Sequence, residues 1–304
     1  MKLTEREAEV LDFLSERKAS AKEVAQALKM KKSNLSTYLK ELEEFQLVKA
    51  KRKGRCKELS LDDRIAFGIS VIKNVFPGVK LSEVLTGKTP YLLANIRSKG
   101  DFRIRELDLP AISAKRILAR LRRAGFVSMR KRGVYHLRNE AEMVSEFCRQ
   151  TLMDAHNTEA ERELGLVTQA VYSFDSTREL GTLFAVKNEV SPKHYWPTAY
   201  TIAHKFGLQI IQAGKWYYTN SKPDLEDVII HILALGRDAR SIMYAAALVL
   251  KNKRNPRLLL KKRQTFGLGK EFLLRFVEFL ETKGAKPFGG LGFGEIGVML
   301  DETV

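Results

Sequence analysis

Two stretches of the chain carry polar and basic side chains of the kinds that contact nucleic acids. In the first stretch, hydroxyl and amide groups lie among lysines, and a basic run follows them. The second stretch is mostly lysine and arginine, and it also ends in a basic run. Lys and Arg neutralise phosphates, and Asn, Lys and Arg also hydrogen-bond base edges. The candidate contact residues are Lys32, Ser33, Asn34, Ser36, Thr37, Lys40, Lys51, Arg52, Lys53 and Arg55 in the first stretch, and Ser113, Lys115, Arg116, Arg120, Arg123, Arg130, Lys131 and Arg132 in the second.

The two stretches are copies of one pattern, shifted by 79 residues without a gap. Each copy predicts an amphipathic helix, a short apolar strand and a basic turn closed by glycine. The candidate residues lie on the side of the helix opposite its apolar positions, and on the turn. The matching pairs are Leu39 and Leu118, Leu42 and Leu121, Leu47 and Phe126, Val48 and Val127, and Gly54 and Gly133.

The helix of the first copy is preceded by signals for two shorter helices. Thr4 and Ser20 each begin a capping box, with glutamate three residues later. We expect Ser33 to cap the third helix. Two short helices, a turn and a longer helix give the helix-turn-helix order. With its basic turn between short strands, the segment 3–61 resembles the winged-helix domains of bacterial and archaeal transcription regulators. The resemblance implies a third helix in the major groove of DNA and a basic wing on the backbone.

The second copy lies in a similar setting. Thr89 and Pro90 predict the start of a helix that ends near Gly100. Residues 102–107 carry apolar positions that we expect to form a second helix, and Pro110 interrupts it before the repeated helix. The segment 89–138 therefore resembles a second winged helix with a shorter wing. We call residues 3–61 the first segment and residues 89–138 the second segment.

The charge of the chain is concentrated where these segments lie. The 304 residues carry a net charge of +17. Residues 1–138 hold 32 Lys and Arg against 16 Asp and Glu, whereas residues 139–250 hold 10 against 14. Clustered cations of this kind favour binding to a polyanion by counterion release. The second segment is the more basic, so we expect it to grip DNA more strongly. The first segment carries glutamates at 41, 43 and 44, which repel phosphate. We therefore expect the first segment to provide sequence discrimination or a protein contact.

We expect a multidomain, mainly α chain with α+β elements: two N-terminal winged helix-turn-helix domains and a C-terminal mixed α/β domain. The expected parts are winged helix 1 (1–62), a connecting helix and linker (63–88), winged helix 2 (89–138), a connecting helix (139–165), and a C-terminal domain for sensing, dimerisation or partner binding (166–304). In the last part we expect strands at 166–174 and 181–186, a hairpin of 208–213 with 216–219, helices after Asp224, Asp238 and Gly269, and a strand at 296–300.

The C-terminal part also resembles, in the order of its expected elements, the AbiEi-type antitoxin and autorepressor family. The likeness involves the run Leu225-Glu226-Asp227-Val228-Ile229 and the helices that follow it. The resemblance implies a regulator that represses its own gene. The duplicated winged helix departs from the single one usual in that family, so a toxin-neutralising role does not transfer to this chain.

Residues for other chemistry are scattered. The five histidines have no carboxylate or cysteine at metal-ligand spacing, and Cys56 and Cys148 form no metal or redox motif. We expect no enzyme activity, catalytic residue, cofactor or metal. Seven cations between Lys251 and Arg263 fit either an auxiliary phosphate contact or a solvated loop. Free cysteines, the lack of an apolar signal-peptide core and the lack of a membrane-length apolar run predict a cytoplasmic protein with no membrane partner.

The sequence thus predicts a double-stranded DNA-binding transcription regulator with recognition helices in the major groove and basic wings on the backbone. We expect the two helices to occupy half-sites about one helical turn apart. A homodimer through the C-terminal domain and a contact with a basal transcription factor or polymerase are expected partners. Two other classes stay open: an enzyme acting on nucleic acid that the winged helices target, and a winged-helix interaction module of a transcription or replication assembly.

Overall fold

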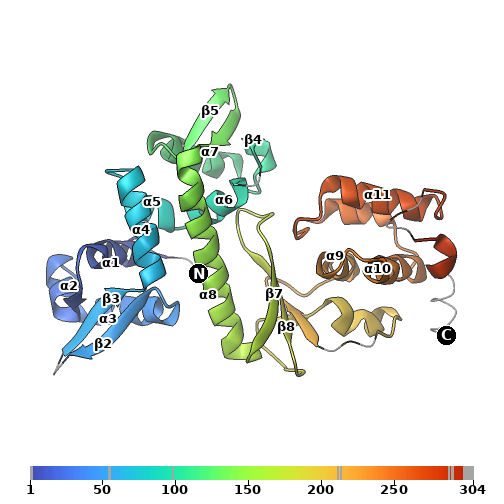
Figure 1. The fold of residues 1–304 in the computed structure, drawn as a ribbon, viewed down its shortest axis with the longest axis horizontal. Helices are drawn as coiled ribbons and strands as arrows, with labels where there is room; N and C mark the ends of the chain where they lie inside the picture. The colour runs from blue at the N-terminus through green and yellow to red at the C-terminus, as the bar shows by residue number, and fades with distance from the viewer. Residues whose placement is uncertain are drawn as a thin grey trace. The chain divides into compact units, whose positions relative to one another are not determined.

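The computed structural model describes residues 3–53, 56–97, 99–210, 212, 214–286, 288 and 291–296. It is a mixed helix and sheet structure that divides into two compact units, Met1–Glu159 and Ala160–Val304 (Figure 1). We call them the N-terminal and the C-terminal unit. The predicted boundaries at residues 62, 88 and 138 lie within the N-terminal unit and stay predictions.

The first segment folds into three helices and a three-stranded antiparallel sheet with strand order β1-β3-β2. Thr4 and Ser20 form the predicted capping boxes of the first two helices. The expectation for Ser33 is wrong, because the third helix already begins at Lys32 and its N-cap is Lys31. The elements are α1 (Glu5–Glu16), β1 (Ala19–Ser20), α2 (Ala21–Ala27), α3 (Lys32–Glu44), β2 (Val48–Lys53) and β3 (Cys56–Leu61).

The second segment has the same order of elements and the corresponding strand order, β4-β6-β5. The second helix predicted at residues 102–107 is wrong: a strand and one 3-10 turn occupy these residues. Phe102 is buried between two exposed neighbours and pairs with Tyr135 of β6. This alternation of buried and exposed residues is typical of a strand, and the spacing of the apolar residues had suggested a helix. The elements are α6 (Thr89–Ile96), β4 (Asp101–Arg103), η1 (Ile104–Glu106), α7 (Ala111–Arg123), β5 (Val127–Lys131) and β6 (Val134–Leu137).

The repeated helices end in the same way. Both α3 and α7 have 13 residues. Gln46 (φ 57°) and Gly125 (φ 84°) occupy the left-handed region just beyond them. In each copy the next backbone N–H donates to a carbonyl in the last turn, Leu47 to Leu42 and Phe126 to Leu121, both at 2.9 Å. These bonds satisfy carbonyls that a helix end leaves unpaired and turn the chain into the strand.

One apolar core joins the two segments within the N-terminal unit. The connection contains α4 (Asp63–Val75) and α5 (Leu81–Leu85), whose buried side chains are members of that core. The rings of Phe76 and Phe126 stack with centroids 4.1 Å apart. The long helix α8 (Glu142–Leu164) adds buried residues from its first turns. The chain between the segments is therefore packed structure.

The C-terminal unit contains an antiparallel sheet with strand order β7-β8-β10-β9. The hairpin predicted for 208–213 with 216–219 is wrong, because β10 pairs with β8 and β9, two strands earlier in the chain. The strand predicted at 296–300 falls mostly outside the described residues. The elements are β7 (Val167–Ser173), β8 (Gly181–Val186), β9 (Trp196–Pro197), η3 (Ala199–Phe206), β10 (Lys215–Tyr218), α9 (Leu225–Leu235), α10 (Ala239–Lys251), η4 (Pro256–Lys261) and α11 (Lys270–Glu281).

The core of the C-terminal unit contains the one fully buried histidine among the described residues. His231 hydrogen-bonds through Nδ1 to the hydroxyl of Thr198 at 2.6 Å and lies beside the rings of Tyr218 and Phe266. Burial lowers the pKa of His231 to about 3, so the ring is neutral in the folded protein. Among the described helices, none is long and apolar enough to cross a membrane.

Helix α4 meets α8 at Gly68, and this contact yields a stability prediction. A Cβ at Gly68 would overlap the ring of Phe147, although alanine is otherwise the better helix former. Gly68→Ala should lower the free energy of unfolding by about 1–3 kcal/mol in urea denaturation. In a Phe147→Leu background the same substitution should cost clearly less. An equal cost in both backgrounds would contradict this packing.

Candidate nucleic-acid interface

The outward side of α3 lines a hollow together with α2 and the β2–β3 hairpin. Its volume is ≈ 1030 Å³. Five predicted residues line it: Lys32, Ser33, Ser36, Thr37 and Lys40. Lys22 on α2 and Lys57 on β3 line it too, although neither was among the predicted contact residues. Four lysines and one acid, Glu43, line this concave surface, and the excess of positive charge suits a phosphate backbone.

The hollow between α3 and the hairpin, ≈ 1030 Å³ in volume, is distinct from a second hollow at the start of the same helix. The predicted residue Asn34 lies in this second hollow, together with Arg6, Lys29 and Lys31. Lys29 adopts a left-handed backbone conformation (φ 50°) in the turn between α2 and α3. Asn34 therefore lies apart from Ser33 and Ser36, although all three were predicted to share one contact surface.

The second half of α3 is acidic. Glu43 is exposed, and Lys40 lies 4.0 Å from the carboxylate of Glu44. The carboxyl group of Glu41 faces that of Glu7 on α1, and the two share a hydrogen bond when one of them is protonated. This contact and the charge of Glu7 raise the pKa of Glu41. Because these carboxylates repel phosphate, only the first half of α3 suits a DNA contact.

The β2–β3 hairpin presents part of the predicted wing. Lys51 and Arg52 are exposed on β2. The side chain of Lys53 and the whole of Arg55 lie outside the described residues. Lys49 lies at the base of the hairpin, 2.8 Å from the carboxylate of Asp62. An ion pair at the base leaves the cations farther along the hairpin as the ones suited to a backbone contact.

Helix α7 is the more basic of the two repeated helices and contains no Asp or Glu. Lys115, Arg116 and Arg123 are exposed as predicted, and Ser113 is half-buried. Arg122, which was not among the predicted contact residues, is also exposed. It lies seven residues after Lys115, about two helical turns along the same side, and this spacing was the available signal.

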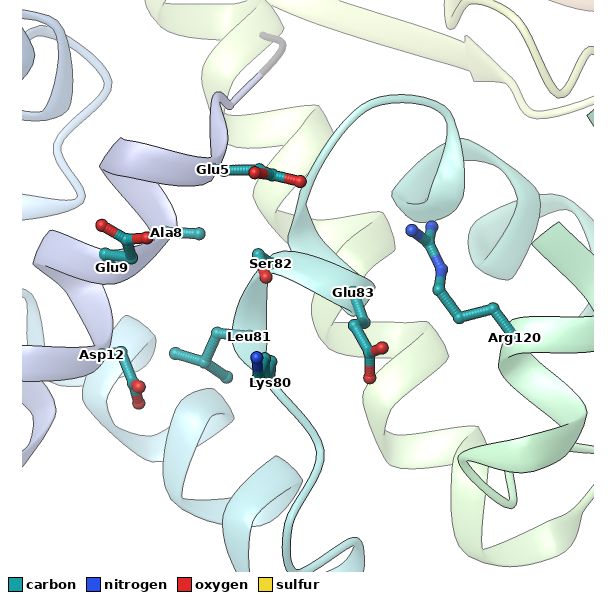
Figure 2. Close-up of a pocket in the computed structure, with 9 residues that line it drawn as sticks. All are labelled: Glu5, Ala8, Glu9, Asp12, Lys80, Leu81, Ser82, Glu83 and Arg120. Carbon is teal, nitrogen blue, oxygen red and sulfur yellow. The ribbon is translucent and has the colours of Figure 1, made fainter. Parts of the chain in front are cut away.

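Arg120 does not lie on the exposed side of α7. Its guanidinium donates a hydrogen bond to the hydroxyl of Thr89, a buried residue at the start of α6. Figure 2 shows the Arg120 side chain at one side of a hollow of ≈ 520 Å³ between α1, α5 and α7. The same hollow is lined by the carboxylates of Glu5, Glu9, Asp12 and Glu83. The assignment of Arg120 as a DNA contact therefore needs its side chain to leave Thr89.

The β5–β6 hairpin carries the second predicted basic run. Arg130, Lys131 and Arg132 are all exposed. The guanidinium of Arg130 lies 3.4 Å from the carboxylate of Asp101, which also contacts His136 at 3.1 Å. Gly133 closes the turn with a φ of 76°, a conformation that glycine adopts without strain. Lys131 and Arg132 are thus the cations nearest the turn.

The starts of α3 and α7 share one further property. Each has an N-cap residue without a side-chain hydrogen bond to the helix, Lys31 and Pro110, as far as the described residues show. Neither first turn contains an acidic residue. Free backbone N–H groups and the positive end of the helix dipole favour a phosphate at such a terminus.

The basic loop of the C-terminal unit is largely ion-paired. Lys262 contacts Asp224 at 2.6 Å and Asp227 at 2.9 Å. Arg257 contacts Glu281 at 2.6 Å, and the carboxylate of Glu226 lies 3.7 Å from Arg254. These pairs neutralise much of the run, and they favour the solvated, structural alternative over an auxiliary phosphate contact.

One comparison with known proteins found a match to part of the chain. A protein-family model described as "Bacterial regulatory protein, arsR family" matches residues 5–50. The matched residues contain α1, α2 and α3 and reach into β2. No curated protein and no solved structure matches the chain. The match supports a helix-turn-helix, DNA-binding transcription regulator, and its residues are those that hold the candidate face of the first segment.

The contact between Glu41 and Glu7 yields a pH-dependent prediction. The raised pKa of Glu41 in the folded state means that native protein binds the proton more tightly than unfolded protein, so stability falls as pH rises through that pKa. Glu41→Gln should therefore raise the melting temperature at pH 7 by about 1–3 °C. The gain should shrink toward pH 4, where Glu41 itself becomes protonated.

The matched control is Glu43→Gln on the same helix, where the side chain is exposed. Differential scanning calorimetry of the three proteins between pH 4 and pH 8 measures the effect. A gain for Glu41→Gln that stays constant across this range, or that Glu43→Gln reproduces, would contradict the assigned contact.

Proposed function

We propose that the protein is a double-stranded DNA-binding transcription regulator with two winged helices, one in each segment. In this proposal α3 and α7 enter the major groove and the β2–β3 and β5–β6 hairpins contact the backbone. The family match over residues 5–50 supports the first winged helix. The observation that carries the second is its equal order of elements and strands around an exposed, acid-free helix.

The two winged helices have unequal roles in this proposal. The second supplies most of the electrostatic attraction, because α7 and its hairpin expose seven cations: Lys115, Arg116, Arg122, Arg123, Arg130, Lys131 and Arg132. The first presents short polar side chains beside lysines at the start of α3, a composition suited to base edges. Its acidic second half favours a protein partner over DNA at that end of the helix.

The proposed mechanism is binding without a chemical reaction, with occupancy of the DNA blocking or recruiting polymerase. The C-terminal unit supplies dimerisation or a contact with the transcription machinery in this scheme. Its relationship to AbiEi-type autorepressors is also a proposal, supported by the order of α9, α10 and α11. Buried His231 packs in the core of that unit, which suits a structural role for this residue.

Removing the charge of the second segment tests the proposed function. Five exposed cations are replaced by alanine together: Lys115, Arg116, Arg130, Lys131 and Arg132. Binding of a fluorescent 30-base-pair duplex (about three helical turns), followed by anisotropy at low salt, should weaken at least about a hundredfold. The slope of log affinity against log salt should fall by up to about 4.5, because each of the five lost phosphate contacts removes roughly 0.9.

A matched control removes five exposed lysines of the C-terminal unit instead: Lys187, Lys193, Lys222, Lys261 and Lys270. This control should keep its duplex affinity within about threefold, since its lysines lie far along the chain from both basic hairpins and only the long-range field changes. If the protein with the altered second segment binds duplex as well as the parent does, the proposed DNA face is wrong.

A further inference from the structure

The two proposed DNA-binding faces lie at opposite ends of the N-terminal unit. In Figure 1 the β2–β3 hairpin projects from one end of this unit, at the lower left, and the β5–β6 hairpin projects from the other end, at the top. The face of the first segment is the hollow between α3 and its hairpin, which Lys32, Lys40 and Lys57 line. The corresponding face of the second segment is the exposed side of α7 together with the β5–β6 hairpin.

The chain between the two segments cannot act as a flexible linker. It contains α4 (Asp63–Val75) and α5 (Leu81–Leu85), and Ile65, Ile69, Ile72 and Val84 from these helices are buried in the common core. On α8, Ser145 donates a hydrogen bond to the backbone carbonyl of Leu93 at 2.8 Å. Close-packed interiors resist sliding, so turning one face toward the other would break these contacts.

A duplex seated on one face would have to bend to reach the other, because the two hairpins project in different directions (Figure 1). The persistence length of double-stranded DNA is about 50 nm, so a binding site of 20–30 base pairs behaves as a rod. From this geometry we infer that one molecule of the protein binds two separate duplex segments, one at each end of its N-terminal unit. This inference rests on the proposed function and replaces the expectation of two adjacent half-sites on one duplex.

Both ends carry enough cations for separate binding. The described residues of the first segment expose Lys22, Lys32, Lys40, Lys51, Arg52 and Lys57 around its face. The second segment exposes a similar number without any acid on α7. The acidic second half of α3 weakens the first face, so the second face should fill at lower protein concentration. The bridged state then forms when a second duplex meets the first face.

A capture experiment tests the bridging. A biotinylated 30-base-pair duplex on beads is mixed with full-length protein and a fluorescent duplex of the same length (about three helical turns), and the fluorescence on the beads is measured at low salt. The parent should capture the second duplex, and excess protein should suppress the capture. Two variants each lose one face: Lys22, Lys32, Lys40, Lys51 and Arg52 to alanine at the first, and the five-alanine second-segment variant described above.

Each single-face variant should capture at least about tenfold less of the second duplex, the effect of losing about 1.4 kcal/mol or more. The first-face variant should still bind one duplex, as anisotropy measures, and the control lacking five C-terminal lysines should capture it like the parent. If either single-face variant bridges as well as the parent, self-association joins the duplexes and the inference is wrong. A parent that binds one duplex but captures no second one also overturns it, while the proposed function stands. A parent that binds no duplex overturns the proposed function itself.

Discussion

The common apolar core of the N-terminal unit determines where its basic side chains lie. Phe76 from the connection stacks on Phe126 from the second segment, and residues from α1 to α8 join the same core. A close-packed core of this kind fixes the positions of the helices that contribute to it. The orientation of α3 and α7 therefore depends on buried residues that carry no charge, and the polar chemistry of the surface can vary without altering that orientation.

The repeat shows how far such variation extends. Glu41 and Arg120 occupy the same position in the two copies, 79 residues apart, and carry opposite charges. Each side chain nevertheless turns toward the helix that begins its segment, Glu41 toward Glu7 and Arg120 toward Thr89. The backbone sets the direction of this position, and the partner on the preceding helix is matched to it. Other positions on the exposed sides of the two helices differ in charge and polarity between the copies, as Ser36 and Lys115 do.

Much of the N-terminal unit could be predicted because its signals are local. The capping boxes at Thr4 and Ser20, the repeated 13-residue helices and the apolar strands all follow from residues close in sequence. The errors arise where distant residues decide. Arg120 is held by Thr89, 31 residues away, and β10 pairs with β8 and β9, which no local alternation identifies. The lysines at 22 and 57 join the hollow only through folding.

A packed connection also changes what two DNA-binding faces can do. Modules joined by a short flexible linker reach an effective concentration in the millimolar range for a second site on the same duplex, so binding within one duplex outcompetes capture of another. The buried residues of α4 and α5 remove that flexibility, because they are part of the common core. The burial of α4 and α5 in the core is therefore the structural feature that would favour binding two duplexes over binding one duplex at two sites.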